Sequence, residues 1–196
     1  ALTLEAGAEM IALPSETAYQ MSDFSSWGVT PSLTLEPDIA APGGNIYSTV
    51  DDGGYAVMSG TSMASPNLAG ISALVKEYAT SVEGLAYADG QQVNALVRAL
   101  LMSTAIPLVY QNQDGMYYSP RNQGSGLANA YAAITTQAYL TVDGCDVPKV
   151  ELYDDPARVG QYTYSFQVHN FGDKTLYYAL DTVAQTEGVN VVEGVN

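Results

Sequence analysis

The spacing of hydrophobic and polar positions divides the chain near Gln137. Before that residue, apolar side chains recur at helical spacing over residues 62–78 and again over 90–103. The second stretch places its apolar residues on one helical face, and Asp89 is expected to be its N-cap. A shorter helix is expected over 127–136. Helices are therefore predicted to dominate the first part of the chain.

Short apolar runs between the helical stretches are typical of strands that lead into loops. Two such runs occupy residues 38–41 and 55–58. Strands that alternate with helices are typical of a layered α/β domain. We therefore predict that the fold class of this part of the chain is α/β.

After Gln137 the hydrophobic period becomes two, as in a half-buried strand. Residues 162–169 are apolar at every other position, and 176–180 repeat the pattern after a turn at 170–173. This pattern predicts an antiparallel hairpin of a β-sandwich, with His169 on its polar, solvent-exposed side. The remaining residues number about 60, fewer than the roughly 100 of an immunoglobulin-type sandwich, so a truncated second domain is expected.

The chain is acidic because it contains few bases. Six Lys and Arg stand against 21 Asp and Glu, which gives a formal net charge of −15 over 196 residues. No basic cluster is present to displace phosphate counterions, so nucleic acid is not expected as a partner. No apolar run reaches the roughly 18–20 residues of a membrane span. The single cysteine, Cys145, excludes an internal disulfide and a cysteine-based zinc site.

The most informative chemical pattern is GTSMASP at residues 60–66. A strand, a glycine turn and a serine at the start of a helix place a hydroxyl beside unpaired amides and the positive end of the helix dipole. Gly60 has no Cβ, so a substrate carbonyl can approach the backbone there. The amide of Ser62 can then stabilise a developing oxyanion. The alternative is a serine that serves only as a helix cap.

This motif, together with FSSWG at 24–28 and PDIAAPG at 37–43, resembles the C-terminal half of a subtilase, a subtilisin-like serine endopeptidase. The resemblance covers about residues 23–136 and extends to cell-envelope subtilases of Gram-positive bacteria, such as lactocepin and the complement-cleaving surface peptidase. It implies three segments: the return from an inserted protease-associated domain (1–21), the C-terminal half of a catalytic domain (22–137) and the start of a truncated fibronectin type III-like sandwich (138–196).

The resemblance also assigns roles around Ser62, which matches the family's nucleophile and whose amide matches the backbone half of the oxyanion hole. Gly60, Thr61 and Met63 match its supporting neighbours. The family's catalytic aspartate and histidine and its oxyanion asparagine lie in motifs farther towards the N-terminus, and none of those motifs occurs here. Asn67 stands where many subtilases have a histidine that is not the triad base.

The function implied by the resemblance is hydrolysis of peptide bonds through an acyl-enzyme on Ser62, in an extracellular or cell-wall setting. The expected partners are a polypeptide substrate and the upstream half of the same protein. Without that half, a serine hydroxyl lacks its base, and these residues are expected to be inactive. Uncovered sheet edges and apolar helix faces also predict self-association. The alternatives are a pseudo-protease and a binding or spacer module.

Other candidate residues have less specific patterns. Ser62, Asp155 and His169 follow the chain order of an α/β-hydrolase triad, but Ala64 stands where that family has a glycine. Calcium needs six to eight oxygen ligands, and no acidic spacing here resembles a calcium loop, so no metal or cofactor is expected. Calcium at the acidic pairs Asp51-Asp52 or Asp154-Asp155 is the alternative. Asp38 is expected to hold loop amides behind the site.

Overall fold

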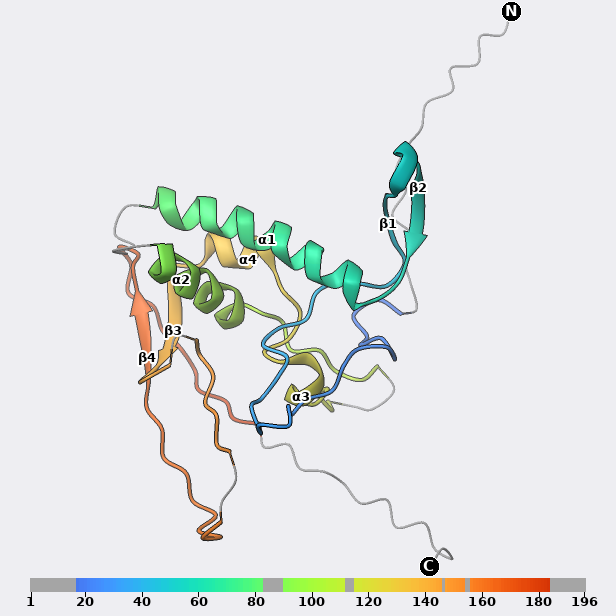
Figure 1. Ribbon diagram of the computed structural model, residues 1–196. Coiled ribbons are helices and arrows are strands. Elements are labelled where there is room, and N and C mark those ends of the chain that lie inside the picture. The colour runs from blue at the N-terminus through green and yellow to red at the C-terminus, as the bar shows by residue number, and fades with distance from the viewer. Residues whose placement is uncertain (1–16, 83–89, 112–114, 146, 154–155, 184–196) are drawn as a thin grey trace, which may run out of the picture.

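Helices supply the packed layer of the fold, and two small antiparallel sheets flank it (Figure 1). The computed structural model describes residues 17–82, 90–111, 115–145, 147–153 and 156–183. The elements in chain order are β1 (Ile46–Thr49), the 3-10 turn η1 (Asp51–Gly53), β2 (Tyr55–Met58), α1 (Thr61–Ser81), α2 (Gly90–Ser103), α3 (Pro120–Gln123), α4 (Ala130–Thr135), β3 (Ala138–Val142) and β4 (Phe166–Asn170). The helices predicted over 62–78 and 90–103 are confirmed, and the one predicted over 127–136 is shorter.

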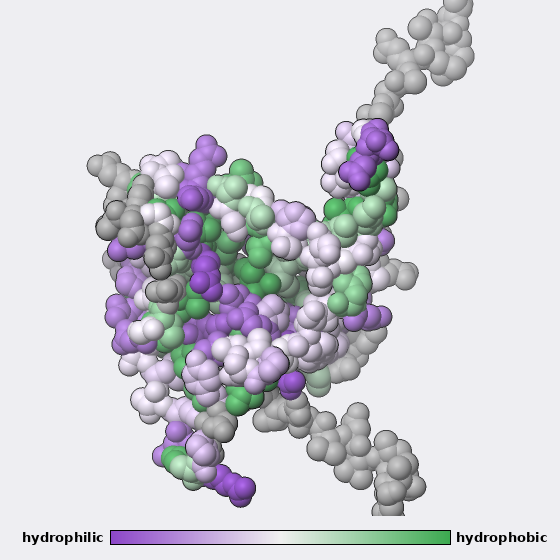
Figure 2. All heavy atoms as spheres, viewed as in Figure 1, coloured by the Kyte–Doolittle hydropathy of each residue, from purple (hydrophilic) through white to green (hydrophobic). Residues whose placement is uncertain are grey.

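Strands β1 and β2 form a hairpin that projects from the helical layer (Figure 1). The rings of Tyr47 and Tyr55 stack across it with their centroids 5.4 Å apart. Figure 2 shows apolar surface on this hairpin below a hydrophilic tip. The strand predicted at 55–58 is confirmed as β2. The run at 38–41 instead forms only isolated bridges to residues near α3, because Ile39 pairs with Gly124 in the antiparallel sense and Ala40 with Leu127 in the parallel sense, so no continuous ladder forms.

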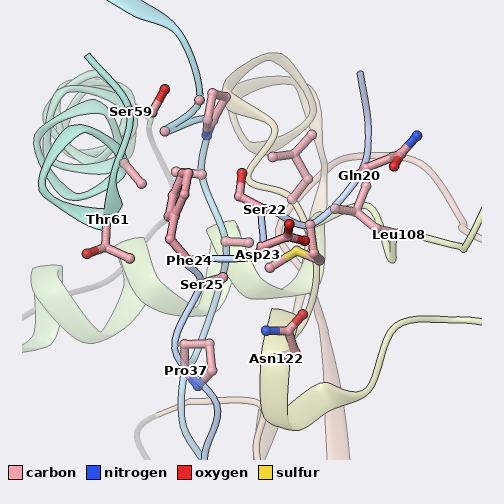
Figure 3. Close-up of a pocket in the computed structure, with 18 of the residues that line it drawn as sticks. Gln20, Ser22, Asp23, Phe24, Ser25, Pro37, Ser59, Thr61, Leu108 and Asn122 are labelled. Atoms are coloured by element: carbon pink, nitrogen blue, oxygen red, sulfur yellow. The ribbon is translucent and has the colours of Figure 1, made fainter. Parts of the chain in front are cut away.

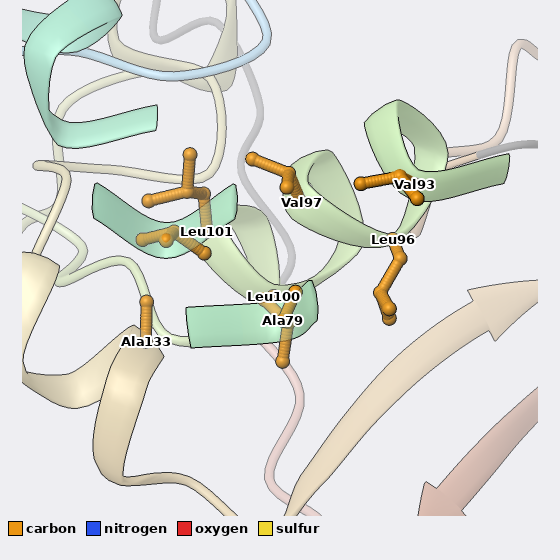
Figure 4. Close-up of a cluster of buried hydrophobic side chains, with 8 residues drawn as sticks. Ala79, Val93, Leu96, Val97, Leu100, Leu101 and Ala133 are labelled. Atoms are coloured by element: carbon orange, nitrogen blue, oxygen red, sulfur yellow. The ribbon is translucent and has the colours of Figure 1, made fainter. Parts of the chain in front are cut away.

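The core lies where α2 packs against the C-terminal half of α1, α4 and β3 (Figure 4). Five residues of α2 face inward at the predicted helical spacing, and each fully buried apolar side chain contributes about 1.5–3 kcal/mol. The buried cluster comprises Val75, Ala79, Val93, Leu96, Val97, Leu100, Leu101 and Ala133. None of the helices in the described part of the chain is long and apolar enough to cross a membrane.

Strand β4 pairs with β3, not with residues 176–180, where the structure has no strand. The predicted hairpin is therefore wrong. The predicted burial is also reversed, since Phe166 and Val168 are exposed while His169 is half-buried. The core covers the face of β3 that carries Tyr139, and His169 lies directly opposite Tyr139 with the two rings stacked at 4.7 Å. Packing of the core on the Tyr139 face of the sheet thus turns His169 inward. Burial on the same face raises the pKa of Tyr139.

The division into segments 1–21, 22–137 and 138–196 stays a prediction, as does the sandwich assignment of the last segment. Most of the first segment lies outside the described residues. Asp89, the predicted N-cap of α2, also lies outside them.

Lys149 joins the chain after β3 to a loop 111 residues earlier. Its ammonium group donates to a carboxylate oxygen of Asp38 and to the carbonyl of Leu35, both at 2.7 Å. It also lies 3.0 Å from a carboxylate oxygen of Glu151 and 3.5 Å from one of Glu36. The segment after β3 is therefore fixed to this loop by charge as well as by hydrogen bonds.

Asp38 is the acid at the centre of this cluster, and its second carboxylate oxygen accepts from Arg98 of α2 at 2.9 Å. Burial alone raises its pKa, but hydrogen bonds from Lys149 and Arg98 outweigh burial and hold the pKa below its usual value. Burial also disfavours the charge of Lys149, yet its hydrogen bonds to Asp38 and Glu151 raise its pKa to about 12. Both groups are therefore charged at neutral pH.

We expect Asp38→Asn to destabilise the fold at pH 7 by about 1–3 kcal/mol, because it removes one partner of a partly buried charged network. A carboxylate whose pKa is lowered by folding stabilises the native state above its unfolded pKa of about 3.9. That contribution is lost as the pH falls through the lower native pKa, so the difference between the two proteins is expected to shrink towards pH 3.

Urea unfolding of both proteins between pH 7 and pH 3 measures this difference. Asp173→Asn, at an exposed acid, is the matched control and is expected to change stability little at any pH. Equal destabilisation by Asp38→Asn at pH 3 and pH 7 would show that the charge of Asp38 plays no part.

Candidate active site

Ser62 is the second residue of α1, and its side chain is exposed. Strand β2 ends at Met58, and Gly60 forms the N-cap with φ +156°, a conformation that L side chains rarely adopt. The order of strand, glycine turn and serine-bearing helix is as predicted. The local sequence therefore places the Ser62 hydroxyl at the surface of the helix start.

A close backbone contact fixes this helix start to the loop that ends at Gly43. The amide of Gly60 donates to the Gly43 carbonyl at 2.8 Å. A Cβ at Gly43 would lie 2.7 Å from the Gly60 carbonyl oxygen and 2.9 Å from the Cβ of Ala64. Only glycine fits at Gly43 without moving the helix, so the PDIAAPG segment supports the serine from behind.

The first turn of α1 leaves the Ser62 amide available. The amides of Met63 and Ala64 donate to the Gly60 carbonyl at 3.0 and 3.3 Å. Within the described ranges, no group accepts a hydrogen bond from the Ser62 amide. The dipole of a 21-residue helix adds positive potential at this end. This arrangement can stabilise negative charge on an oxygen close to the Ser62 hydroxyl.

Two hollows flank the helix start. Ser62, Met63 and Asn67 line one of about 410 Å³ beneath the β1–β2 hairpin. Thr61 lines a larger one of about 940 Å³, which Figure 3 shows between the helix start, residues near Phe24 and α3. The predicted nucleophile Ser62 and its neighbour Met63 therefore face the smaller hollow, and Thr61 faces the larger one.

The histidine of this chain does not approach Ser62. His169 lies on β4, beside the far end of α1, and its Nε2 atom is 2.7 Å from the Thr141 hydroxyl (Figure 1). The 21 residues of α1 span about 30 Å between the two places. Asp155 lies outside the described residues. The Ser62–Asp155–His169 alternative is therefore wrong, because its serine and its histidine occupy opposite ends of the helical layer.

Among the residues that the structure describes, acidic side chains do not form a cluster near Ser62. Asp51 and Asp52 lie exposed in η1 at the tip of the hairpin. Across the part of the chain that the structure describes, no three His, Cys, Asp or Glu side chains come together in a way that could hold a metal ion.

Asp38 does support the loop, but the prediction that its carboxylate holds loop amides is wrong. The carboxylate binds Lys149 and Arg98 instead, and its backbone carbonyl accepts from the amide and the hydroxyl of Ser125 at 2.9 and 2.8 Å. Sequence reasoning missed both cations, since no local pattern links residues this far apart. The small number of Lys and Arg residues was the one feature of the sequence that could have pointed to these two cations.

Comparison with known protein families matches residues 7–133 to the subtilase family. Among curated proteins, the PII-type proteinase of Lacticaseibacillus paracasei is 37% identical over 90% of this chain, and the C5a peptidase of Streptococcus pyogenes is 36% identical over 91% of it. The solved structure of the Clostridium perfringens CspB protease is 29% identical, with a TM-score of 0.45, over 59% of this chain and 23% of that one.

The chain spans only 10% of the length of the first of these proteinases and 15% of the C5a peptidase. The family match nevertheless includes all three motifs that flank or contain Ser62. It also covers more than half of the 196 residues. On this evidence the chain belongs to the subtilase family of serine peptidases, and the helices and strands within the matched residues 7–133 form part of a subtilisin-like α/β domain.

Proposed function

We propose that this chain carries the nucleophile of a subtilisin-like serine endopeptidase that acts on polypeptides. The observation that carries the proposal is the position of Ser62, which is exposed at a helix start beside an available amide and an open hollow. Membership of the subtilase family supports the same conclusion. The proposed setting, extracellular or attached to the cell wall, follows from the resemblance to cell-envelope subtilases.

In the proposed reaction the Ser62 hydroxyl attacks the carbonyl carbon of the scissile peptide bond. A histidine from outside these residues takes the hydroxyl proton and later gives it to the leaving amine, while an aspartate orients that histidine. The oxyanion is held by the Ser62 amide and by an asparagine that is also supplied from outside. Water then hydrolyses the acyl-enzyme ester and regenerates Ser62.

The upstream half of the protein is the proposed source of these missing groups. The larger hollow and the exposed face of α1 are suitable surfaces for it, because only Val75 and Ala79 of that helix are buried and Leu74 is 58% exposed. Without that half the same apolar surfaces favour self-association, and the serine has no base.

We expect Ser62→Ala to abolish labelling of the full-length protein by a fluorophosphonate probe and to lower kcat by about 10⁶-fold, as in subtilisin. The probe reacts only with a serine that a neighbouring base activates. For that reason the 196 residues alone are expected to remain unlabelled. Gel fluorescence and peptide hydrolysis measure the two effects.

Ser165→Ala, at an exposed serine on the segment before β4, is the matched control and is expected to retain full labelling. Absence of labelling in the unmodified full-length protein would favour the pseudo-protease alternative. Strong labelling of the isolated 196 residues would contradict the requirement for an upstream base.

Peroxide treatment of the full-length protein is expected to lower kcat by about tenfold, less than the loss of an oxyanion donor. Met63 lies beside Ser62 in the smaller hollow, and its oxidation to the sulfoxide adds a polar oxygen there. Met63→Ala is expected to make activity resistant to peroxide, whereas Met116→Ala, at an exposed methionine, is expected to leave the sensitivity unchanged. Equal peroxide sensitivity of the Met63→Ala protein would refute this placement of Met63.

A further inference from the structure

We propose that Lys149 is a positioning residue for Ser62, acting from outside the subtilase part of the chain through the loop that ends at Gly43. Lys149 follows β3 and lies beyond residues 7–133, the part matched to the family. The inference rests on the proposed function, because positioning Ser62 matters only if Ser62 is the nucleophile.

The contacts of Lys149 are numerous and largely shielded from water. Its ammonium group has three N–H donors, and three oxygens lie within 3.0 Å of the nitrogen, from Asp38, Leu35 and Glu151. Its side chain is 13% exposed, compared with 52% for Arg98, the other cation on Asp38. Solvent screens Arg98 far more, so Lys149 provides the stronger restraint on the loop.

The segment that carries Lys149 holds the loop at two points. A carboxylate oxygen of Glu151 accepts from the amide of Leu35 at 2.6 Å, while Lys149 binds the carbonyl of the same residue. Both backbone groups of Leu35 are thus bound to one short segment. If Lys149 were neutral, the carboxylates of Glu36, Asp38 and Glu151 would face one another without the cation that now lies between them, and the loop would move apart.

The restraint passes from Asp38 to Ser62 along a short, hydrogen-bonded path. The residues after Asp38 are held by bonds of 2.8 Å between Ala40 and the 126–128 segment. At Gly43 the loop accepts from the amide of Gly60, the N-cap of the helix on which Ser62 is the second residue. Since there is no room for a Cβ at Gly43, a shift of the loop towards α1 would displace the helix start, and a shift away from it would break the hydrogen bond from the Gly60 amide.

The test measures kcat per titrated active site in the full-length protein, because a merely destabilised protein has fewer sites but an unchanged kcat at each. Lys149→Met, which keeps the stem and removes the charge, is expected to lower kcat per site by about tenfold with KM nearly constant, since small misplacements of a nucleophile are costly. Lys149→Arg is expected to restore most of this loss.

Lys174→Met removes the same charge at an exposed lysine and is expected to leave kcat per site unchanged. If Lys149→Met yields no soluble protein, Glu151→Gln replaces it as the test variant, because Glu151 binds both Lys149 and the amide of Leu35. This variant is expected to lower kcat per site about twofold to threefold. Values equal to the Lys174→Met control would overturn the inference. Ser62→Ala separates the two claims, because activity that survives Ser62→Ala contradicts the proposed function itself.

Discussion

The close contact between Gly43 and Gly60 is the constraint on which the site depends. Here a loop and a helix start meet backbone against backbone, joined by one hydrogen bond of 2.8 Å with no room for a Cβ at Gly43. The contact fixes where α1 begins and therefore where Ser62 lies. The unusual φ of Gly60 then lets the chain pass from β2 into the helix within two residues.

Electrostatic interactions reinforce this contact at the other end of the loop. The chain has a net charge of −15 and only six Lys and Arg, yet two of them converge on Asp38. Burial of Lys149 keeps its ion pairs from being screened as surface pairs are. Two of the few bases of this acidic chain, Arg98 and Lys149, thus bind the loop that carries Asp38. Through Lys149, the segment after β3 is attached to the loop that supports the start of α1.

Local patterns explain which parts of the structure could be predicted from the sequence. The apolar face of α2 and the strand–glycine–serine order at β2, Gly60 and Ser62 depend on neighbouring residues, and both were predicted. The pairing of β4 with β3 was not, because its register depends on how the core covers Tyr139. The contact between Lys149 and Asp38 was missed for the same reason, since it joins residues 111 positions apart.

The most direct test of this account is a crystal structure of the full-length protein after reaction with diisopropyl fluorophosphate. The account predicts phosphorus bonded to the Ser62 Oγ atom, a phosphoryl oxygen within about 3 Å of the Ser62 amide, and a histidine from outside these residues on the other side. Phosphorus on another side chain, or a Ser62 amide bound to an internal acceptor, would contradict it.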